Sequence, residues 1–185
     1  LRDTGVNEFE KFAKEKGMKV VGREFTNDKA SDFNAILTKV RSMKPDVVMY
    51  GGMDATAGPM AKQMKQLGMK STLLAGDGVC SPEFIKLAGN AADIMKCSNA
   101  GEAVEKLAKG ADFVAKYKKR FNTDVQVYSP YSYDAVYVIV EAMKKAGKAD
   151  RASITTALRD TNYDGLTGKI AFDAKGDIKD GAISM

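Results

Sequence analysis

The sequence predicts an α/β fold in which a parallel sheet is flanked by helices. Short apolar runs rich in β-forming residues, such as 47–50 and 71–75, alternate with segments whose apolar residues recur at helical spacing, such as 33–40. Strands that are separated by helices pair as parallel neighbours, and the helices then cover the sheet on both faces. Residues 47–50 form an unbroken apolar run, which is typical of a parallel strand buried on both faces.

The first hundred residues carry the clearest alternation of helices and strands. Ser81, Pro82 and Glu83 mark a helix start, because a hydroxyl cap, a proline at the first helical position and an acid in the first turn occur together. Gly17 and Gly68 end two earlier helices. The expected helices lie at 6–13, 33–40, 60–67 and from 82 onward, the expected strands at 18–25, 47–50, 71–75 and 91–97, and the turns between them at 51–58 and 76–78.

The last third of the sequence, from about Val125, changes character and indicates a second structural unit. Residues 131–143 are apolar on nearly every face and predict a helix buried on most sides. Around it we expect an exposed loop at 98–110, helices at 113–121 and 153–158, and a β-hairpin that joins 169–172 to 178–184 through a turn containing Gly176.

Composition excludes several kinds of active site. The 185 residues contain no histidine and only two cysteines, which removes Ser-His-Asp and Cys-His catalysis, His-ligated metals and four-cysteine zinc sites. No phosphate-binding glycine motif follows a strand, so a nucleotide enzyme is disfavoured. The sequence begins at Leu1 within an expected helix and without a signal pattern, so we expect it to be a piece of a longer protein.

The charge pattern gives no nucleic-acid site. Lys and Arg number 29 against 24 Asp and Glu, a formal net charge of +5. The densest basic clusters, 116–120 and 144–148, fall late in expected helices, where cations interact favourably with the helix dipole. We interpret them as solvated helix ends.

Two glycine-rich turns are the best candidates for a ligand site. Residues 51–54 (Gly-Gly-Met-Asp) and 76–78 (Gly-Asp-Gly) each follow an expected strand, and ligands of open parallel sheets bind beyond the carboxyl ends of the strands. Asp77, flanked by glycines, is suited to accept hydrogen bonds from an ammonium group. The residues alone leave open that this is only a turn, and an acid–base pair of Asp54 and Asp77 is disfavoured because no nucleophile accompanies it.

The residues alone allow two interpretations of each of two further features. Cys80 and Cys97 are 17 positions apart and fit either a disulfide or two buried thiols. The aromatic stretch 128–134 fits either the mouth of a ligand crevice or a cap on the core.

Six motifs, in order and with matching spacing, resemble the periplasmic leucine/isoleucine/valine-binding proteins, which are the substrate-binding components of branched-chain amino acid ABC transporters. The resemblance covers essentially the whole chain, although members are roughly twice as long. The motifs are 45–54 (PDVVMYGGMD), 61–68 (AKQMKQLG), 76–79 (GDGV), 128–134 (YSPYSYD), 163–168 (YDGLTG) and 172–178 (FDAKGDI).

The resemblance implies a type I periplasmic binding fold of two α/β lobes joined by a three-stranded hinge, with an amino acid held between the lobes. Residues 1–124 would then form most of the second lobe, and residues 125–185 an incomplete return to the first. It also implies a periplasmic binding protein rather than an enzyme, without cofactor or metal. The intact protein would be a monomer that serves an ABC transporter's membrane subunits and binds no nucleic acid.

The resemblance also assigns ligand contacts. Asp77 matches the acid that binds the α-ammonium group, and Met53 stands where the family has an aromatic residue beside the ligand. The wall around Met53 would include Gly52 and Asp54. Tyr128 or Tyr131 would cover the apolar side chain of a branched aliphatic amino acid. The periplasmic setting favours a Cys80–Cys97 disulfide.

Two rival functions remain at this stage. The first is a ligand-sensing regulator of the same fold, such as an amide or amino-acid sensor, which would signal to a protein partner. The second is an enzyme with a doubly wound sheet, against which the missing histidine, metal ligands and phosphate loop all count.

Overall fold

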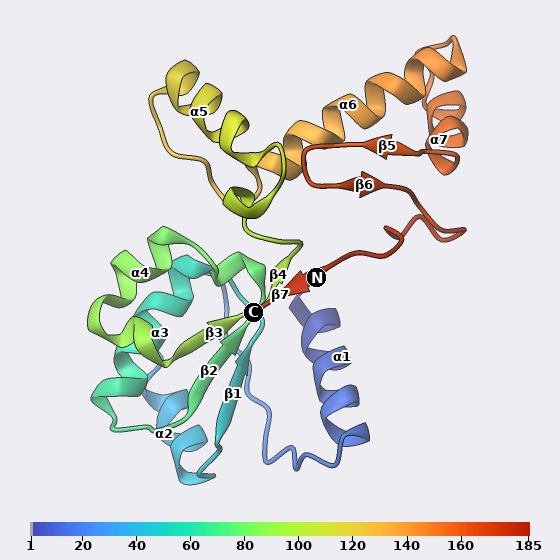
Figure 1. The fold of residues 1–185 in the computed structure, drawn as a ribbon. Coiled ribbons are helices and arrows are strands. Elements are labelled where there is room, and N and C mark those ends of the chain that lie inside the picture. Colours follow the sequence, from blue (N-terminus) through green and yellow to red (C-terminus); the bar gives the residue numbers. More distant parts are fainter. Residues whose placement is uncertain (1) are drawn as a thin grey trace. The chain divides into compact units, whose positions relative to one another are not determined.

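The computed structural model describes residues 2–185, with side chains from residue 5 onward. The described chain divides into two compact units (Figure 1). Unit 1 contains residues up to Asn99 together with Met185, and unit 2 contains Ala100–Ser184. This division falls earlier than residue 124, where the sequence led us to expect the change of lobe. The assignment of either unit to a lobe of a larger protein stays a prediction.

Unit 1 is built on a three-stranded parallel sheet in the order β1-β2-β3. Tyr50 at the end of β1 pairs with Ala75 at the end of β2, and Ala75 pairs in turn with Cys97 of β3. The elements are α1 (Arg2–Glu15), α2 (Asn34–Ser42), β1 (Val47–Tyr50), α3 (Asp54–Gln66), β2 (Thr72–Ala75), the 3₁₀ turn η1 (Asp77–Val79), α4 (Pro82–Ala88), the 3₁₀ segment η2 (Gly89–Ile94) and β3 (Met95–Cys97). The expected parallel sheet with flanking helices is therefore confirmed.

The core of unit 1 lies between this sheet and helices α2, α3 and α4. Phe33, Leu37, Met64, Leu73 and Phe84 are all almost completely buried there. The predicted cap of α4 is present, since the Ser81 hydroxyl accepts a hydrogen bond from the Phe84 amide at 3.1 Å. Burying such side chains contributes roughly 1.5–3 kcal/mol each, so this cluster is the main source of the stability of unit 1.

The strand expected at 18–25 does not form. Val20, Val21 and Phe25 are instead exposed, and the segment makes no ladder with the sheet. The Arg23 side chain of this segment contacts α1 instead. Its Nη1 donates a hydrogen bond to Oδ1 of Asn7 at 2.6 Å and forms an ion pair with Glu10 at 3.5 Å. High β propensity alone therefore does not make this segment a strand.

The helix expected from Met60 begins earlier, at Asp54, so the expected turn at 51–58 is only three residues long. The Met53 carbonyl accepts hydrogen bonds from the amides of Thr56 and Ala57 and starts the helix. Gly58 and Pro59 disfavour helix in the sequence, but both lie inside α3, where Gly58 packs against α4. Tertiary contact outweighs local propensity here.

Unit 2 is mainly helical, and its strands are only two residues long. β4 pairs with β7, and β5 pairs with β6 as an antiparallel hairpin. None of the helices in the described part of the chain is long and apolar enough to cross a membrane. The elements are β4 (Asn99–Ala100), the 3₁₀ turn η3 (Val104–Lys106), α5 (Gly110–Phe121), α6 (Ser129–Ala146), α7 (Arg151–Arg159), β5 (Tyr163–Asp164), β6 (Lys169–Ile170) and β7 (Ile183–Ser184).

The hairpin expected between 169–172 and 178–184 forms only beside its turn, and its outer residues pair elsewhere. Next to the turn, Phe172 and Ile178 form an antiparallel bridge, flanked by backbone hydrogen bonds from Asp173 to Asp177 and from Lys179 to Ala171. β6 pairs with β5 on its amino-terminal side instead, and β7 pairs with the distant β4. Sequence-local turn signals identified the bend but not the strand partners.

The prediction that the helix at 131–143 is buried on most sides is also wrong. In α6 only Pro130, Asp134, Val138 and Ala142 are buried, and they lie in one stripe at i, i+4, i+8 and i+12. Five other large apolar side chains of the helix are exposed: Tyr133, Val136, Tyr137, Ile139 and Val140.

Asp134 is the polar centre of unit 2. Its Oδ1 accepts a hydrogen bond from the Leu166 amide at 2.8 Å, and its Oδ2 accepts from the Thr167 amide at 2.7 Å and the Thr167 hydroxyl at 2.6 Å. A Cβ at Gly165 would clash with the Asp134 carboxylate, so the glycine permits this close approach. The buried carboxylate thereby fixes the β5–β6 hairpin against α6.

We expect Asp134→Ala to destabilise unit 2 by about 2–4 kcal/mol, because it leaves buried amide donors without an acceptor. Urea unfolding followed by tyrosine fluorescence measures this loss. Ser132→Ala, at an exposed position on the same helix, is the control and should change stability by less than about 0.5 kcal/mol. Equal effects of the two substitutions would contradict the role given to Asp134.

A hydrogen bond with Tyr137, together with burial, raises the pKa of Tyr133 to about 12. A tyrosine whose pKa is raised by folding stabilises the fold below its unfolded pKa, near 10, and this stabilisation is lost as the pH rises toward 12. We therefore expect unit 2 to lose stability between about pH 10 and pH 12. Tyr133→Phe should reduce this loss, and a spectrophotometric titration should show one fewer late-titrating tyrosine. If the titration curve of Tyr133→Phe matched that of the unsubstituted protein, the raised pKa assigned to Tyr133 would be wrong.

Candidate functional site

The two glycine-rich turns predicted from the sequence lie side by side in unit 1. They follow β1 and β2, which are adjacent and end in register at Tyr50 and Ala75. Contact between the turns is direct, because the side chain of Met53 occupies the space where a Cβ at Gly78 would lie. The carboxyl ends of parallel strands are where open α/β sheets bind ligands. The structure therefore brings Gly52, Met53, Asp54 and Asp77 together in the position expected for a site.

The first turn is fixed by a short chain of hydroxyl groups. The Thr56 hydroxyl donates to the Met53 carbonyl at 3.1 Å, and the Tyr50 hydroxyl lies 2.6 Å from the Thr56 hydroxyl. Because Thr56 has only one hydroxyl proton, Tyr50 is the donor in the second bond. Gly52 lies directly against the Tyr50 ring. The side chain of Met53 remains 54% exposed and is available to a ligand.

Asp54 joins the two turns. Its Oδ1 accepts a hydrogen bond from the Ala55 amide at 2.8 Å, and its Oδ2 accepts one from the Ser81 hydroxyl at 2.6 Å. The Ser81 oxygen also caps α4, so one carboxylate links the start of α3 to the start of α4. The sequence identified Ser81 only as a helix cap. Its partnership with Asp54 has no signal in the sequence, because the two residues are 27 positions apart.

Asp77 opens the second turn as the first residue of η1. It is half-buried, and its carbonyl accepts a hydrogen bond from the Cys80 amide at 3.0 Å. Gly76 and Gly78 on either side carry no side chains that would restrict access to it. A carboxylate in this position is suited to a charge-assisted hydrogen bond with an ammonium group.

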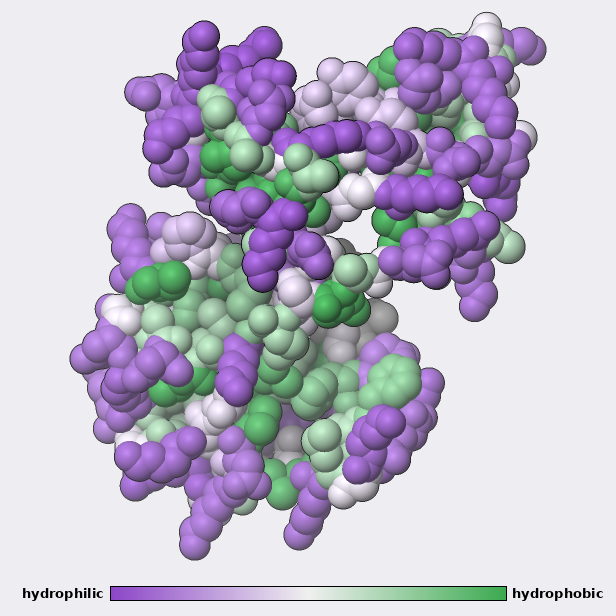
Figure 2. Space-filling view, viewed as in Figure 1, coloured by the Kyte–Doolittle hydropathy of each residue, from purple (hydrophilic) through white to green (hydrophobic). Residues whose placement is uncertain are grey.

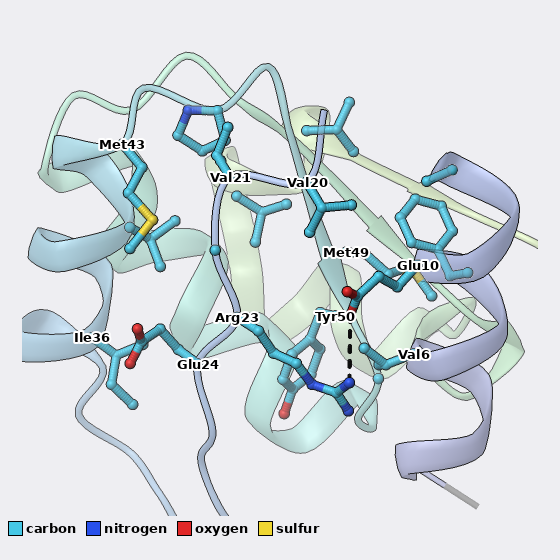
Figure 3. Close-up of a pocket in the computed structure, with 18 of the residues that line it drawn as sticks. Val6, Glu10, Val20, Val21, Arg23, Glu24, Ile36, Met43, Met49 and Tyr50 are labelled. Carbon is cyan, nitrogen blue, oxygen red and sulfur yellow. Dashed lines mark hydrogen bonds and ion pairs between the residues drawn. The ribbon is translucent and has the colours of Figure 1, made fainter. Parts of the chain in front are cut away.

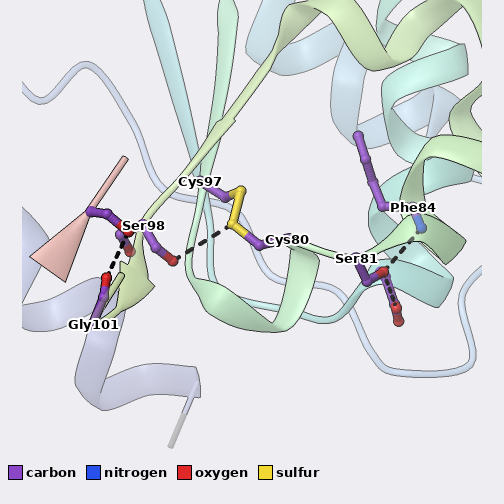
Figure 4. The surroundings of a disulfide bond; sticks show 8 residues. Cys80, Ser81, Phe84, Cys97, Ser98 and Gly101 are labelled. Atoms are coloured by element: carbon purple, nitrogen blue, oxygen red, sulfur yellow. Dashed lines mark hydrogen bonds between the residues drawn. A yellow bond between two sulfur atoms is a disulfide. The ribbon is translucent and has the colours of Figure 1, made fainter. Parts of the chain in front are cut away.

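A disulfide holds the second turn to the neighbouring strand (Figure 4). Cys80, at the end of η1, is bonded to Cys97, the last residue of β3, with a Cα–Cα distance of 5.8 Å. The disulfide predicted from the sequence is therefore confirmed. With Ser81 bonded to Asp54, the turn that carries Asp77 is attached to β3 on one side and to α3 on the other.

The two candidate tyrosines belong to unit 2. Tyr128 is the N-cap residue of α6 and is 46% exposed. Tyr131, one turn into the helix, donates a hydrogen bond from its hydroxyl to the Ala100 carbonyl of β4. Tyr131 therefore connects α6 to the strand with which unit 2 begins.

A cavity of about 720 Å³ lies elsewhere in unit 1, between α1, the segment 18–26, α2 and β1 (Figure 3). Its walls are mainly apolar, with side chains such as Val6, Val20 and Ile36, and the Glu10–Arg23 ion pair crosses it. The cavity runs along the unpaired edge of β1 and does not include Asp77. The 18–25 segment, which is not part of the sheet, forms one of its walls, and we do not assign the ligand site to it.

The described residues contain no group of three or more Cys, Asp or Glu side chains placed to hold a metal ion. The candidate site consists of backbone turns, the half-buried carboxylates of Asp54 and Asp77, and the side chain of Met53. Such a set of groups can bind and orient a small molecule with an ammonium group.

The three-stranded parallel sheet and its flanking helices define an α/β protein, and its two glycine-rich turns lie at the edge where such sheets bind ligands. Residues 2–183 match the family described as "Periplasmic binding protein", and the chain belongs to that family. Its fold is the type I periplasmic binding fold.

Comparison with individual proteins supports the same family. The chain is 30% identical over 172 residues to the leucine-, isoleucine-, valine-, threonine- and alanine-binding protein of Pseudomonas aeruginosa, covering 93% of this chain and 46% of that protein. It is also 30% identical to Leu/Ile/Val-binding protein homolog 1 of Brucella abortus, again over 46% of its length. The chain thus spans about half the length of the curated relatives it matches.

Solved structures show the same fold. A leucine-binding protein, LivK, from Thermotoga maritima superposes with a TM-score of 0.86 at 29% identity, over 96% of this chain and 51% of that one. The branched-chain amino acid transporter substrate-binding protein LivJ from Streptococcus pneumoniae, solved with isoleucine, gives a TM-score of 0.74 at 22% identity over 94% of this chain and 55% of that one. At that identity the second comparison supports the fold alone.

We expect reduction of the Cys80–Cys97 disulfide to lower the free energy of unfolding by about 3 kcal/mol, because the bond closes a loop of 17 positions. Urea unfolding with and without reductant measures the difference. A Cys80→Ser/Cys97→Ser double variant is the control, and its stability should not respond to reductant. Two reactive thiols in the unreduced, denatured protein would overturn the prediction.

Proposed function

We propose that this chain supplies one wall of the binding site of a periplasmic solute-binding protein, which delivers a small neutral, branched aliphatic amino acid to an ABC transporter. The intact protein would close around its ligand by a hinge motion between lobes and would catalyse no reaction. The observation that carries the proposal is the pair of adjacent turns at the ends of β1 and β2, with Asp77 in one and Met53 in the other.

Each group has a defined role in this proposal. The Asp77 carboxylate binds the α-ammonium group of the amino acid through charge-assisted hydrogen bonds. Met53, an unbranched and adaptable side chain, contacts the ligand next to the Gly52 backbone, while Asp54 holds the two turns in place. Tyr128 or Tyr131 covers the aliphatic side chain.

Two features support an amino acid as the ligand. The relatives reported above are named for binding leucine, isoleucine and valine. An acidic side chain on a glycine-flanked turn suits the ammonium group of a ligand, whereas it would repel a phosphate group placed at the same point. A regulator of the same fold would bind a similar ligand but signal to a protein, and a transport assay with the membrane subunits distinguishes the two functions.

We expect Asp77→Asn to weaken amino-acid binding by about 10- to 150-fold, since hydrogen bonds to charged groups contribute about 1.5–3 kcal/mol. The measurement is calorimetric titration of leucine, isoleucine and valine into the whole protein that the gene encodes, with the 185-residue chain titrated in parallel.

Asp28→Asn, at an exposed position in the same unit, is the matched control and should bind like the unsubstituted protein. Unchanged affinity in Asp77→Asn would remove Asp77 from the site. A whole protein that binds no amino acid at all would overturn the proposed function.

A further inference from the structure

One methionine of the candidate site is open to solvent. The chain has ten methionines, all of them among the described residues, and seven are buried or partly buried. The three exposed ones are Met18, Met53 and Met185. Met18 belongs to the segment between α1 and α2, and Met185 follows β7, so of these three only Met53 lies in a glycine-rich turn.

Few other side chains of this chain compete with methionine for an oxidant. The two cysteines are bonded to each other, so neither is a free thiol, and the sequence contains no tryptophan and no histidine. A thioether needs no deprotonation before it reacts, so its oxidation depends mainly on access to the sulfur. Figure 2 shows apolar side chains at the surface of unit 1 between hydrophilic patches, where a small oxidant in water can reach them.

The sulfur atom of Met53 lies at the contact between the two turns. A Cβ on Gly78 would lie only 2.5 Å from this sulfur and 3.6 Å from the carbonyl oxygen of Gly52. The sulfur therefore fills the space that the absent side chain of Gly78 leaves, next to the residue that carries the Asp77 carboxylate. The backbone of Met53 is fixed as well, because its carbonyl accepts the first hydrogen bonds of α3. A change at this sulfur is thus a change in the wall of the candidate site.

Oxidation changes both the size and the polarity of the Met53 side chain. A peroxide or hypochlorous acid transfers one oxygen atom to the sulfur, which loses two electrons, while the oxidant is reduced to water or to chloride. The product is a sulfoxide, whose oxygen accepts hydrogen bonds and donates none. The Gly52 carbonyl and the Asp77 carboxylate are acceptors too, so neither can donate to this oxygen. An apolar wall is thereby replaced by a larger and polar one.

We propose that Met53 is an oxidation site that controls ligand binding: its sulfoxide weakens the binding of an aliphatic amino acid, and a bound amino acid protects Met53 from the oxidant. This role rests on the proposed function, in which Met53 contacts the ligand. Binding is weakened because an aliphatic ligand offers the sulfoxide oxygen no donor in place of water. A methionine sulfoxide reductase reverses the change, since a dithiol is oxidised to a disulfide while the oxygen leaves as water.

The test treats the whole encoded protein with hydrogen peroxide and measures leucine, isoleucine and valine binding by calorimetric titration before and after. Peptide mass spectrometry locates the added oxygen. We expect the sulfoxide of Met53 to weaken binding by about 5- to 100-fold, since a buried acceptor is left without a donor. A saturating amino acid should slow the oxidation of Met53 by at least about tenfold, because it covers the sulfur. Met18, at 59% exposure against 54% for Met53, is the internal control and should be oxidised equally with and without the amino acid.

Two variants separate Met53 from the other methionines. Met53→Leu keeps an apolar side chain of similar volume without sulfur, so peroxide should change its affinity by less than about twofold. Met18→Leu is the matched control and should lose affinity on oxidation as the unsubstituted protein does. Methionine sulfoxide reductase should restore the affinity of the oxidised protein.

Three outcomes would overturn the role of Met53 alone: oxidation of Met18 without oxidation of Met53, unchanged affinity in protein that carries the Met53 sulfoxide, or an equal loss of affinity in Met53→Leu. An untreated whole protein that binds no amino acid would overturn the proposed function and, with it, the role of Met53.

Discussion

The parallel hydrogen bonding of β1, β2 and β3 is the constraint on which the candidate site depends. Because β1 and β2 end in register at Tyr50 and Ala75, the two turns that follow must emerge next to each other. A shift of one residue in this register would send the alternate side chains to the other face and separate the turns. The register itself is held by the buried cluster around Leu73 and Phe84, so apolar packing places the polar groups of the site.

A hydrogen bond and a disulfide then restrain the turns that the sheet brings together. Asp54 accepts the Ser81 hydroxyl, and the disulfide attaches Cys80 to β3, so the turn that carries Asp77 is restrained on both sides. Such restraint reduces the conformational entropy that a ligand would otherwise have to remove on binding. Met53, by contrast, stays largely exposed and has three rotatable bonds, which allows it to adapt to ligands of different shape.

Unit 2 shows how a single buried polar group organises a segment with few strands. The Asp134 carboxylate satisfies the amides of Leu166 and Thr167, and this fixes a hairpin that has only four paired residues. The other side of the same helix carries exposed apolar side chains such as Val136 and Ile139.

Local patterns in the sequence determined the α/β class, the helix boundaries near Ser81 and Gly17, and the two turns that hold Asp77 and Met53, because capping and strand signals act between neighbours. Only the tertiary structure decided which strands pair and which faces are buried. It left 18–25 out of the sheet through the contact of Arg23 with α1, paired β6 with β5, and linked Asp54 to Ser81. These outcomes depend on residues far apart in the chain, whose competition for partners no local pattern records.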